Sequence, residues 1–252
     1  MCFNKNMARI THERWKVYGN VFDQFTINDL IKLSKQKHYD ELISPVSIGK
    51  EANVFSARKK EEGAEVYKIV KIYRLEACNF NKMYDYIKHD PRYYNIKKQR
   101  RQVIFSWVQR EYRNIMKARE AGVKVPKPIA LLHHVFVMQM IGDEATGESA
   151  QRLKQHSPKN PADFFEKLIK NLALLYQKAK LVHGDLSEYN ILNWKEIPVI
   201  IDMSQASPID AANADELLDR DIRNMVSYFK KHGVEITAEE LKKKIIGKTQ
   251  DK

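Results

Sequence analysis

The sequence predicts an α+β fold in two halves, an antiparallel sheet with one main helix followed by a mainly helical half. Segments rich in valine, isoleucine and tyrosine, typical of β-strands, gather between residues 43 and 73. A long apolar stripe at helical spacing follows over 103–121, and such stripes dominate from residue 160 onward. An acidic, glycine-marked stretch at 142–147 separates the halves, so we predict a first domain at 26–142 and a second at 143–252.

The composition favours a globular protein with anionic partners. The chain of 252 residues carries 44 Lys+Arg against 32 Asp+Glu, a formal net charge of +12. A surplus of this size attracts polyanions such as RNA, or acidic protein surfaces, although a basic surface without clustering would give the same total. Cys2 and Cys78 are the only cysteines, which excludes a disulfide framework and a CxxC metal site. Because no signal-peptide core or membrane-length apolar run is present, we expect a cytoplasmic protein.

The first half begins with an arm and a helix. Residues 1–25 are polar and lack a clear period, which indicates a loosely held arm, and 26–39 show helical spacing, which predicts an extra N-terminal helix. Three strands then form an antiparallel meander, with a polar turn at 59–63 between the second and the third. The predicted strands span 46–49, 53–57 and 66–73.

A weakly patterned insertion at 76–102 interrupts this half. Long segments of this kind inside a domain are usually functional or mobile, so we predict an inserted flexible loop. Its basic cluster either forms a solvated face or contacts a phosphate backbone; the cluster consists of Lys97, Lys98, Arg100 and Arg101. A helix over 103–121 follows and ends at Gly122. Its predicted apolar stripe consists of Ile104, Phe105, Val108, Tyr112, Ile115 and Met116.

The remaining elements have recognisable boundaries. Apolar runs at 129–132 and 135–140 complete the sheet. Asn160 supplies an N-cap before Pro161, which opens a helix. Another long helix is expected over 214–232, and a capping box formed by Thr237 with Glu240 begins a last short helix.

A carboxylate and an amide five residues apart carry the chemistry of the second half. Asp185 and Asn190 follow His183-Gly184 and precede a short apolar strand. Phosphoryl-transfer enzymes use such a carboxylate to orient the attacking hydroxyl and such an amide to hold a metal on the phosphates. Asp202 ends the next strand and offers a second hard oxygen ligand for Mg²⁺. A zinc site of the histidine and the two aspartates is the alternative, and it lacks a cysteine or a second nearby histidine.

The sheet supplies candidates for nucleotide binding. Lys71 lies in an otherwise apolar strand, and because a buried ammonium needs an anionic partner, we expect Glu111 of the long helix to pair with it. The alternative places this lysine at the surface of an edge strand. The loop 47–54 lies where a phosphate-covering loop is expected, although it has one glycine and not the three of GxGxxG. The stretch 138–141 lies where an adenine would meet the backbone, unless it only fills the core.

Several of these stretches together resemble the RIO branch of the protein-kinase superfamily, in its type-one, short archaeal-like form. The stretches are 49–54, 70–73, 182–190 and 201–206, and the resemblance runs from about residue 30 to residue 233. It implies a bilobal protein-kinase-like fold with an antiparallel-sheet N-lobe, a mainly helical C-lobe, and ATP with Mg²⁺, or Mn²⁺ in its place, as cofactors. It also implies work in small ribosomal subunit maturation, with the pre-ribosomal small subunit and its RNA as partners, which agrees with the basic charge.

The resemblance assigns roles residue by residue. Lys71 would bind phosphate with Glu111 as its helix partner, and Asp185 would be the catalytic aspartate. Asp202 would be a metal ligand that also accepts phosphate, as an aspartyl-phosphate intermediate of ATP hydrolysis. The remaining carried-over positions are Asn190 for the metal, the backbones of Gln139 and Ile141 for adenine, and Ser47, Gly49, Lys50 and Val54 in the phosphate-covering loop.

Departures from ordinary protein kinases shape the functional alternatives. His183-Gly184-Asp185 replaces His-Arg-Asp and no Ala-Pro-Glu follows Asp202, so we expect no control by activation-loop phosphorylation. Two functions fit the residues equally: a serine/threonine kinase acting on itself or another protein, and an ATPase switch on pre-ribosomal RNA. A small-molecule kinase of the aminoglycoside or choline type is disfavoured by 49–54 and 187–189. A non-catalytic RNA-binding module is disfavoured because every catalytic position is filled.

Overall fold

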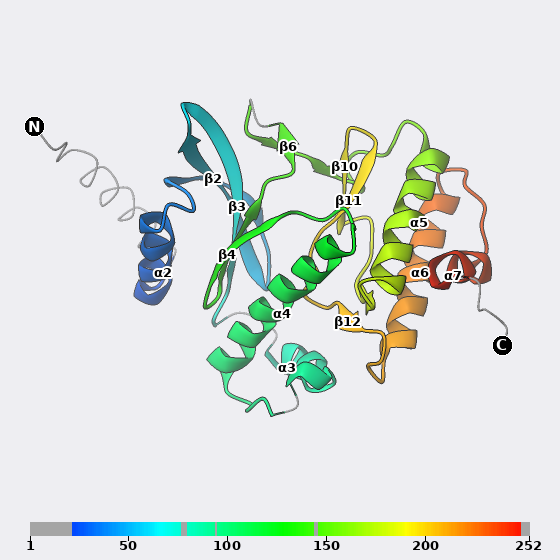
Figure 1. Ribbon diagram of the computed structural model, residues 1–252, viewed down its shortest axis with the longest axis horizontal. Coiled ribbons are helices and arrows are strands. Elements are labelled where there is room, and N and C mark those ends of the chain that lie inside the picture. Colours follow the sequence, from blue (N-terminus) through cyan, green and yellow to red (C-terminus); the bar gives the residue numbers. More distant parts are fainter. Residues whose placement is uncertain (1–21, 77–79, 94, 144–145, 248–252) are drawn as a thin grey trace, which may run out of the picture.

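The computed structural model describes residues 22–76, 80–93, 95–143 and 146–247. Most of the predicted N-terminal arm, Cys2 and Cys78 lie outside these ranges. The described chain has two lobes, a sheet with its helices and a mainly helical lobe, which lie side by side in Figure 1. This confirms the predicted α+β, bilobal architecture. No described helix is both long and apolar enough to cross a bilayer.

The N-lobe is built on a five-stranded antiparallel sheet in the order β1-β2-β3-β5-β4. Its first three strands form the predicted meander and run longer than expected. Residues 59–61 continue the pairing of β2 with β3, and β1 begins earlier, where Glu41 pairs with Arg58. Glu62 and Gly63, both with positive φ, make the two-residue turn that suits the twist of such a hairpin. The strands are β1 Glu41–Ile48, β2 Ala52–Glu61, β3 Ala64–Tyr73, β4 Pro128–Leu132 and β5 Val135–Gln139.

Two helices cover the opposite faces of this sheet (Figure 1). Helix α2 (Gln24–Lys35) confirms the extra N-terminal helix and is capped by the Asp23 carboxylate, which accepts from Thr26 N at 2.8 Å. Successive side chains of a strand point to opposite faces. Val135 and Val137 therefore join the core cluster that includes helix α2, while Phe136 joins the one that includes helix α4 (Arg100–Glu120).

The buried face of α4 differs from the predicted stripe. Met116 is 38% exposed, whereas the polar side chains of Arg110, Glu111 and Asn114 are buried. The helix lies between the sheet, the insertion and the C-lobe, so it has buried polar surface on a side that an amphipathic pattern assigns to solvent.

The insertion at 76–102 is the main correction to the predicted fold. Its described residues include helix α3 (Phe80–Lys88) and a short 3₁₀ turn, η1 (Pro91–Tyr93), in place of a flexible loop. Met83 and Ile87 are fully buried in the core against α4, and their spacing of four places them on one face of the helix. In the basic cluster, Lys97 and Lys98 are exposed and Arg100 and Arg101 form the first turn of α4.

The stretch at 142–147, expected to be a linker, takes part in a small hairpin. Strand β6 (Gly142–Asp143) pairs with β7 (Glu148–Ser149). A Cβ on Gly142 would lie 2.1 Å from the carbonyl oxygen of Glu148, so a glycine is required by this close pairing. The acidic, glycine-marked composition therefore reflects a tight hairpin between the lobes.

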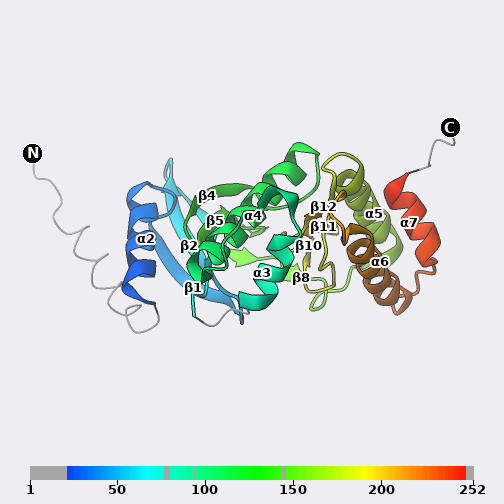
Figure 2. The same cartoon turned by 90° about the horizontal axis from the view of Figure 1, so that it is seen from below.

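The C-lobe packs three helices behind short strand pairs (Figure 2). Asn160 caps helix α5 (Pro161–Gln177) through Asp163 N, and the Thr237–Glu240 capping box begins α7 (Ala238–Ile246), both as predicted. Helix α6 (Ala214–Lys230) lies beside them. The short strands of this lobe are β8 Gln151–Arg152, β9 Leu181–Val182, β10 Ile191–Trp194, β11 Ile197–Ile200 and β12 Ser207–Pro208.

Candidate active site

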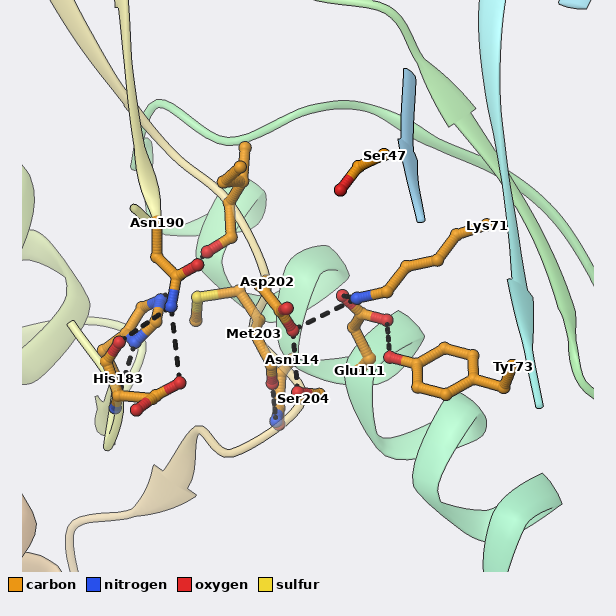
Figure 3. A network of polar contacts seen from close by, with 12 residues as sticks. Ser47, Lys71, Tyr73, Glu111, Asn114, His183, Asn190, Asp202, Met203 and Ser204 are labelled. Atoms are coloured by element: carbon orange, nitrogen blue, oxygen red, sulfur yellow. Dashed lines mark hydrogen bonds and ion pairs between the residues drawn. The ribbon is translucent and has the colours of Figure 1, made fainter. Parts of the chain in front are cut away.

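Lys71 joins the two lobes at the inner end of the site. Its Nζ lies 2.8 Å from Glu111 Oε1 and 3.1 Å from Asp202 Oδ1 (Figure 3). Burial alone would lower the pKa of Lys71, but the two carboxylates outweigh burial and raise the pKa above its ordinary value. The lysine is therefore charged and buried with an anionic partner on α4, as predicted, and it is not a surface residue.

Tyr73 completes this ion pair. Its hydroxyl donates to Glu111 Oε2 at 2.5 Å, so each oxygen of the buried carboxylate has a partner. Tyr73 lies two residues after Lys71 on the same face of β3, and this alternation was the signal in the sequence that could have found it.

Asp202 occupies an unusual backbone conformation two residues after the end of β11. Its φ is +60°, in the left-handed region that non-glycine residues rarely adopt. Ser204 Oγ donates to Asp202 Oδ1 at 2.7 Å. Burial would raise the pKa of Asp202, but the Lys71 ammonium and the Ser204 hydrogen bond lower it to about 2. The carboxylate is therefore fully ionised at neutral pH.

The segment around Asp185 is held by short polar contacts. Asn190 Nδ2 donates to the Asp185 carbonyl at 2.8 Å and lies 3.4 Å from its carboxylate Oδ2. The buried His183 ring lies 3.1 Å from the carbonyl oxygen of Ile201, which ties this segment to the one bearing Asp202 (Figure 3). Burial raises the pKa of Asp185 above its usual range.

Asp221 is a further residue that holds the segment around Asp185 in place. From helix α6 its buried carboxylate accepts from Gly184 N at 2.7 Å and from Leu186 N at 2.8 Å, on either side of Asp185. Asp221 lies one turn after Leu217 and beside Ile222, on the buried stripe of α6. A carboxylate at a position of the apolar stripe of this helix was the sequence signal for a residue that holds buried backbone N–H groups.

A cavity of about 1160 Å³ opens between the lobes from this ion pair. Lys71, Asp202 and Asn190 line its inner end. The other predicted residues on its wall are Ser47, Val54, Glu111, Gln139 and Ile141. Asp185 is not on this wall and lies behind Asn190.

Gly49 and Lys50, the outer part of the predicted phosphate-covering loop, lie away from the cavity wall. Gly49 N donates to Ala52 O at 3.0 Å in the turn between β1 and β2, and a Cβ on Gly49 would also lie 3.0 Å from that oxygen. Lys50 is exposed. Neither residue lines the cavity, so their contact with phosphate stays a prediction.

The backbone at 139–141, where adenine is predicted to bind, has one carbonyl and one N–H that a base can contact. Gln139 donates its N–H to Lys127 O at 2.8 Å, so its carbonyl is the group that can accept from a base. Ile141 accepts at its carbonyl from Ala150 N at 2.7 Å, so its N–H is the group that can donate. One acceptor and one donor two residues apart match the edge of an adenine.

Comparison with known proteins agrees with this geometry. A model of the RIO domain matches residues 53–242. The chain belongs to the RIO family. It is 39% identical over 235 residues to the RIO-type serine/threonine-protein kinase Rio1 of Haloferax volcanii, covering 93% of this chain and 79% of the relative. It is 38% identical to the Rio1 of Methanocaldococcus jannaschii over 95% of this chain and 80% of that one. Within the family it is a RIO-type serine/threonine protein kinase.

Solved structures show the same fold. A Rio2 kinase from Chaetomium thermophilum superposes with a TM-score of 0.65 at 26% identity, covering 87% of this chain and 67% of that one. A second structure of that kinase, its ADP/Mg²⁺-phosphoaspartate complex, gives a TM-score of 0.66 at 24% identity, with coverage of 96% and 77%. The RIO fold therefore extends over both lobes described above.

The donor set of this RIO kinase fits Mg²⁺. Because Asn190 uses its amide nitrogen on Asp185, its side-chain oxygen is the atom left for a cation, in the same cavity as the ionised Asp202 carboxylate. Among the described residues no three His, Cys, Asp or Glu side chains cluster as a protein-only metal site. Two oxygen donors suit an ion that keeps waters and takes its other ligands from phosphates.

Proposed function

We propose that this RIO kinase binds ATP in the cavity between its lobes and transfers the γ-phosphoryl group at the end where Asp185, Asn190 and Asp202 lie. The observation that carries the proposal is the contact of Lys71 with both Glu111 and Asp202, at 2.8 and 3.1 Å. This contact puts one fixed cation at the inner end of a cavity whose other end offers adenine a donor and an acceptor. Phosphoryl transfer depends on such positioning and on electrostatic stabilisation.

The chain's own residues divide the work. Lys71 holds the phosphates, with Glu111 and Tyr73 fixing its position, while Ser47 and Val54 cover the nucleotide. When Mg²⁺ is bound, it neutralises charge on the phosphates, and Asn190 and Asp202 are the residues that would hold it. Asp185 orients the attacking hydroxyl and takes its proton, and the raised pKa of its carboxyl suits that role.

Asp202 has a second proposed role, as phosphate acceptor. One carboxylate oxygen of Asp202 would attack the γ-phosphorus, the bond to the β–γ bridging oxygen would break, and ADP would leave with that oxygen. Water would then cleave the acyl phosphate to restore the carboxylate and release phosphate. Support comes from the low pKa of Asp202, which keeps it anionic, and from the phosphoaspartate named in the Rio2 complex.

The proposed setting is the maturation of the small ribosomal subunit, with its RNA as partner. The net charge of +12 and the exposed lysines of the basic cluster support a polyanionic partner. An ATPase switch is the second candidate function, because an acyl phosphate on Asp202 leads to ATP hydrolysis without phosphorylation of a partner.

The deciding experiment is mass spectrometry of the protein after incubation with Mg-ATP, combined with hydroxylamine treatment. Phosphate on Asp202 that hydroxylamine removes would support the acyl-phosphate route. Hydroxylamine-resistant phosphate confined to serine would support the plain kinase. Absence of any phosphate transfer and any ATP turnover would refute the proposed site.

A further inference from the structure

A buried polar network lies on α4 next to the contact between Glu111 and Lys71. Arg110 and Asn114 are one helical turn apart on α4 and have no exposed surface. Glu111, next to Arg110, faces the Lys71 side. The same turn of the helix therefore contacts the phosphate-binding lysine through Glu111 and a separate group of polar partners through Arg110 and Asn114.

Those partners belong to the segment that follows Asp202. Asn114 Nδ2 donates to the carbonyl oxygens of Met203 and Ala206, at 3.0 and 2.8 Å (Met203 in Figure 3). Arg110 Nη2 donates to Ser207 Oγ at 2.6 Å. The turn 203–207 is thus held by three side-chain hydrogen bonds from α4.

The same turn is linked to the catalytic aspartate. Ser207 pairs with Val182 in the β9–β12 pair, and Val182 directly precedes His183-Gly184-Asp185. A displacement of this turn would therefore shift both Asp202 at one end and the start of the Asp185 segment at the other.

The insertion supplies the counter-charge of this network. Asp90, 1% exposed, lies 3.0 Å from Arg110 Nε through its Oδ2, and Arg92 donates to both of its carboxylate oxygens at 2.8 and 2.6 Å. A buried guanidinium that loses its carboxylate is strongly destabilised. Asp90 is therefore what allows Arg110 to remain charged inside the protein and to reach Ser207.

Arg92 also sets the orientation of Asn114. Its Nη1 donates to Asn114 Oδ1 at 2.9 Å, so the amide oxygen faces the insertion and the amide nitrogen faces Met203 and Ala206. This contact and the two hydrogen bonds from Nδ2 together fix the orientation of the amide. The insertion thus supports the orientation in which the amide nitrogen of Asn114 meets the turn.

Asp202 depends on such support, because a non-glycine residue at φ +60° is strained and persists only where its neighbours over-determine it. We propose that Asp90 is a positioning residue for Asp202, acting through Arg110 and through Arg92 with Asn114. The insertion then belongs to the machinery that places the metal-binding carboxylate. This inference rests on the proposed role of Asp202 as a metal ligand.

Three variants test the inference. Asp90→Asn keeps the shape of the side chain and removes the charge. Asn114→Asp still accepts from Arg92 but has no N–H to donate to the two carbonyls, so it cuts the network at its last step. Asp85→Asn is the matched control, because it removes an exposed carboxylate of the same insertion that contacts only Lys88 in the described chain, at 2.7 Å.

Two measurements on the whole protein give the readout. Hydrogen exchange of the peptide covering 202–207, in the absence of nucleotide, should be about tenfold faster in Asp90→Asn and Asn114→Asp than in the wild type and Asp85→Asn. Calorimetry should show about tenfold weaker binding of ADP with Mg²⁺ in these two variants, and binding of ADP with EDTA within about twofold of wild type. Ser207→Ala, which removes one acceptor, repeats the test should Asp90→Asn fail to fold.

Two results would overturn the inference. One is behaviour of both network variants that matches Asp85→Asn in exchange and in Mg²⁺-dependent binding. The other is hydrogen exchange in the network variants that accelerates as much over α5 as over 202–207, while their Mg²⁺-dependent binding of ADP stays unchanged. That result would show general destabilisation of the protein. The variant Asp202→Asn distinguishes a failure of this inference from a failure of the proposed function. If Asp202→Asn leaves the Mg²⁺ effect on ADP binding intact, Asp202 is not a metal ligand. The exchange experiment still reports whether Asp90 places the turn.

Discussion

Lys71 Nζ lies 3.1 Å from Asp202 Oδ1, and this contact joins an N-lobe strand to a residue two positions beyond the end of a C-lobe strand. The same ammonium is 2.8 Å from Glu111. One lysine therefore pairs with two carboxylates from different parts of the fold, and it joins the two lobes at the cavity.

Replacing Lys71 with methionine should abolish this arrangement. The buried Glu111 would lose its cation, which costs about 3 kcal/mol of unfolding free energy, and phosphate transfer should fall at least about a hundredfold. Thermal denaturation and ATP turnover measure the two effects. Lys68→Met, on the opposite face of the same strand, is the matched control and should keep near-normal turnover. Equal losses in both variants would contradict the special role of Lys71.

Asp185→Asn should separate binding from chemistry. Because Asp185 lies behind Asn190 and off the cavity wall, ATP affinity should stay within about threefold of wild type while turnover falls by about two to four orders of magnitude. Equilibrium binding of a nucleotide and release of labelled phosphate are the measurements. Unchanged turnover would remove Asp185 from the mechanism.

The sequence predicted those parts of the site that depend on a local pattern or on the free-energy cost of an unpaired buried charge. Lys71 in an apolar strand requires an acid, and Glu111 lies on the stripe side of the neighbouring helix, so their pairing could be predicted. Asp185, Asn190 and Asp202 have characteristic spacing next to short strands, and the fold brings them to one end of the cavity.

The remaining partners depend on topology that local pattern does not carry. Asp221 reaches Gly184 from 37 residues away, across the C-lobe. Helix α3 buries only Met83 and Ile87, too few apolar positions to distinguish a nine-residue helix from a loop. The glycine-marked stretch at 142–147 resembles a linker because tight hairpins and linkers use the same residue.

His134 should make the N-lobe sensitive to mild acid. Burial lowers the pKa of this histidine to about 4, whereas an unfolded histidine titrates near about 6.5. The folded state therefore resists protonation, so its stability is full above about pH 6.5 and declines as the pH falls from about 6.5 toward about 4. In denaturant titrations His134→Gln should flatten this decline. His156→Gln, at an exposed position, should retain it, and a wild-type slope in His134→Gln would contradict the assignment.

The basic cluster offers a test of RNA binding. Replacing Lys97, Lys98, Arg100 and Arg101 with glutamine should weaken binding to single-stranded RNA and reduce the slope of log affinity against log salt by about 0.7 for each phosphate that the protein no longer neutralises. Filter binding over a salt series measures this slope. The control variant replaces lysines of the opposite lobe, Lys230 and Lys231, and should keep the wild-type slope. An unchanged slope in the cluster variant would identify these side chains as solvated surface.

Gly184 is required by the close approach of the segments that bear Asp185 and Asp202. It has φ +78°, and a Cβ at this position would lie 2.8 Å from the carbonyl oxygen of Gln205, in the turn that follows Asp202. Gly184→Ala should therefore lower unfolding free energy by about 2 to 4 kcal/mol, from backbone strain and from the forced separation of the segments, and should reduce turnover with it.

Gly233 provides the matched control for this substitution. It has the same φ of +78°, yet among the described residues no atom lies within 4 Å of the position that a Cβ would take. Gly233→Ala should lose only the about 1 kcal/mol that positive φ imposes on alanine, with turnover unchanged. The difference between the two variants, measured by denaturant unfolding and phosphate release, isolates the contact between Gly184 and Gln205. Equal destabilisation and equal turnover would show that this contact does not constrain the active site.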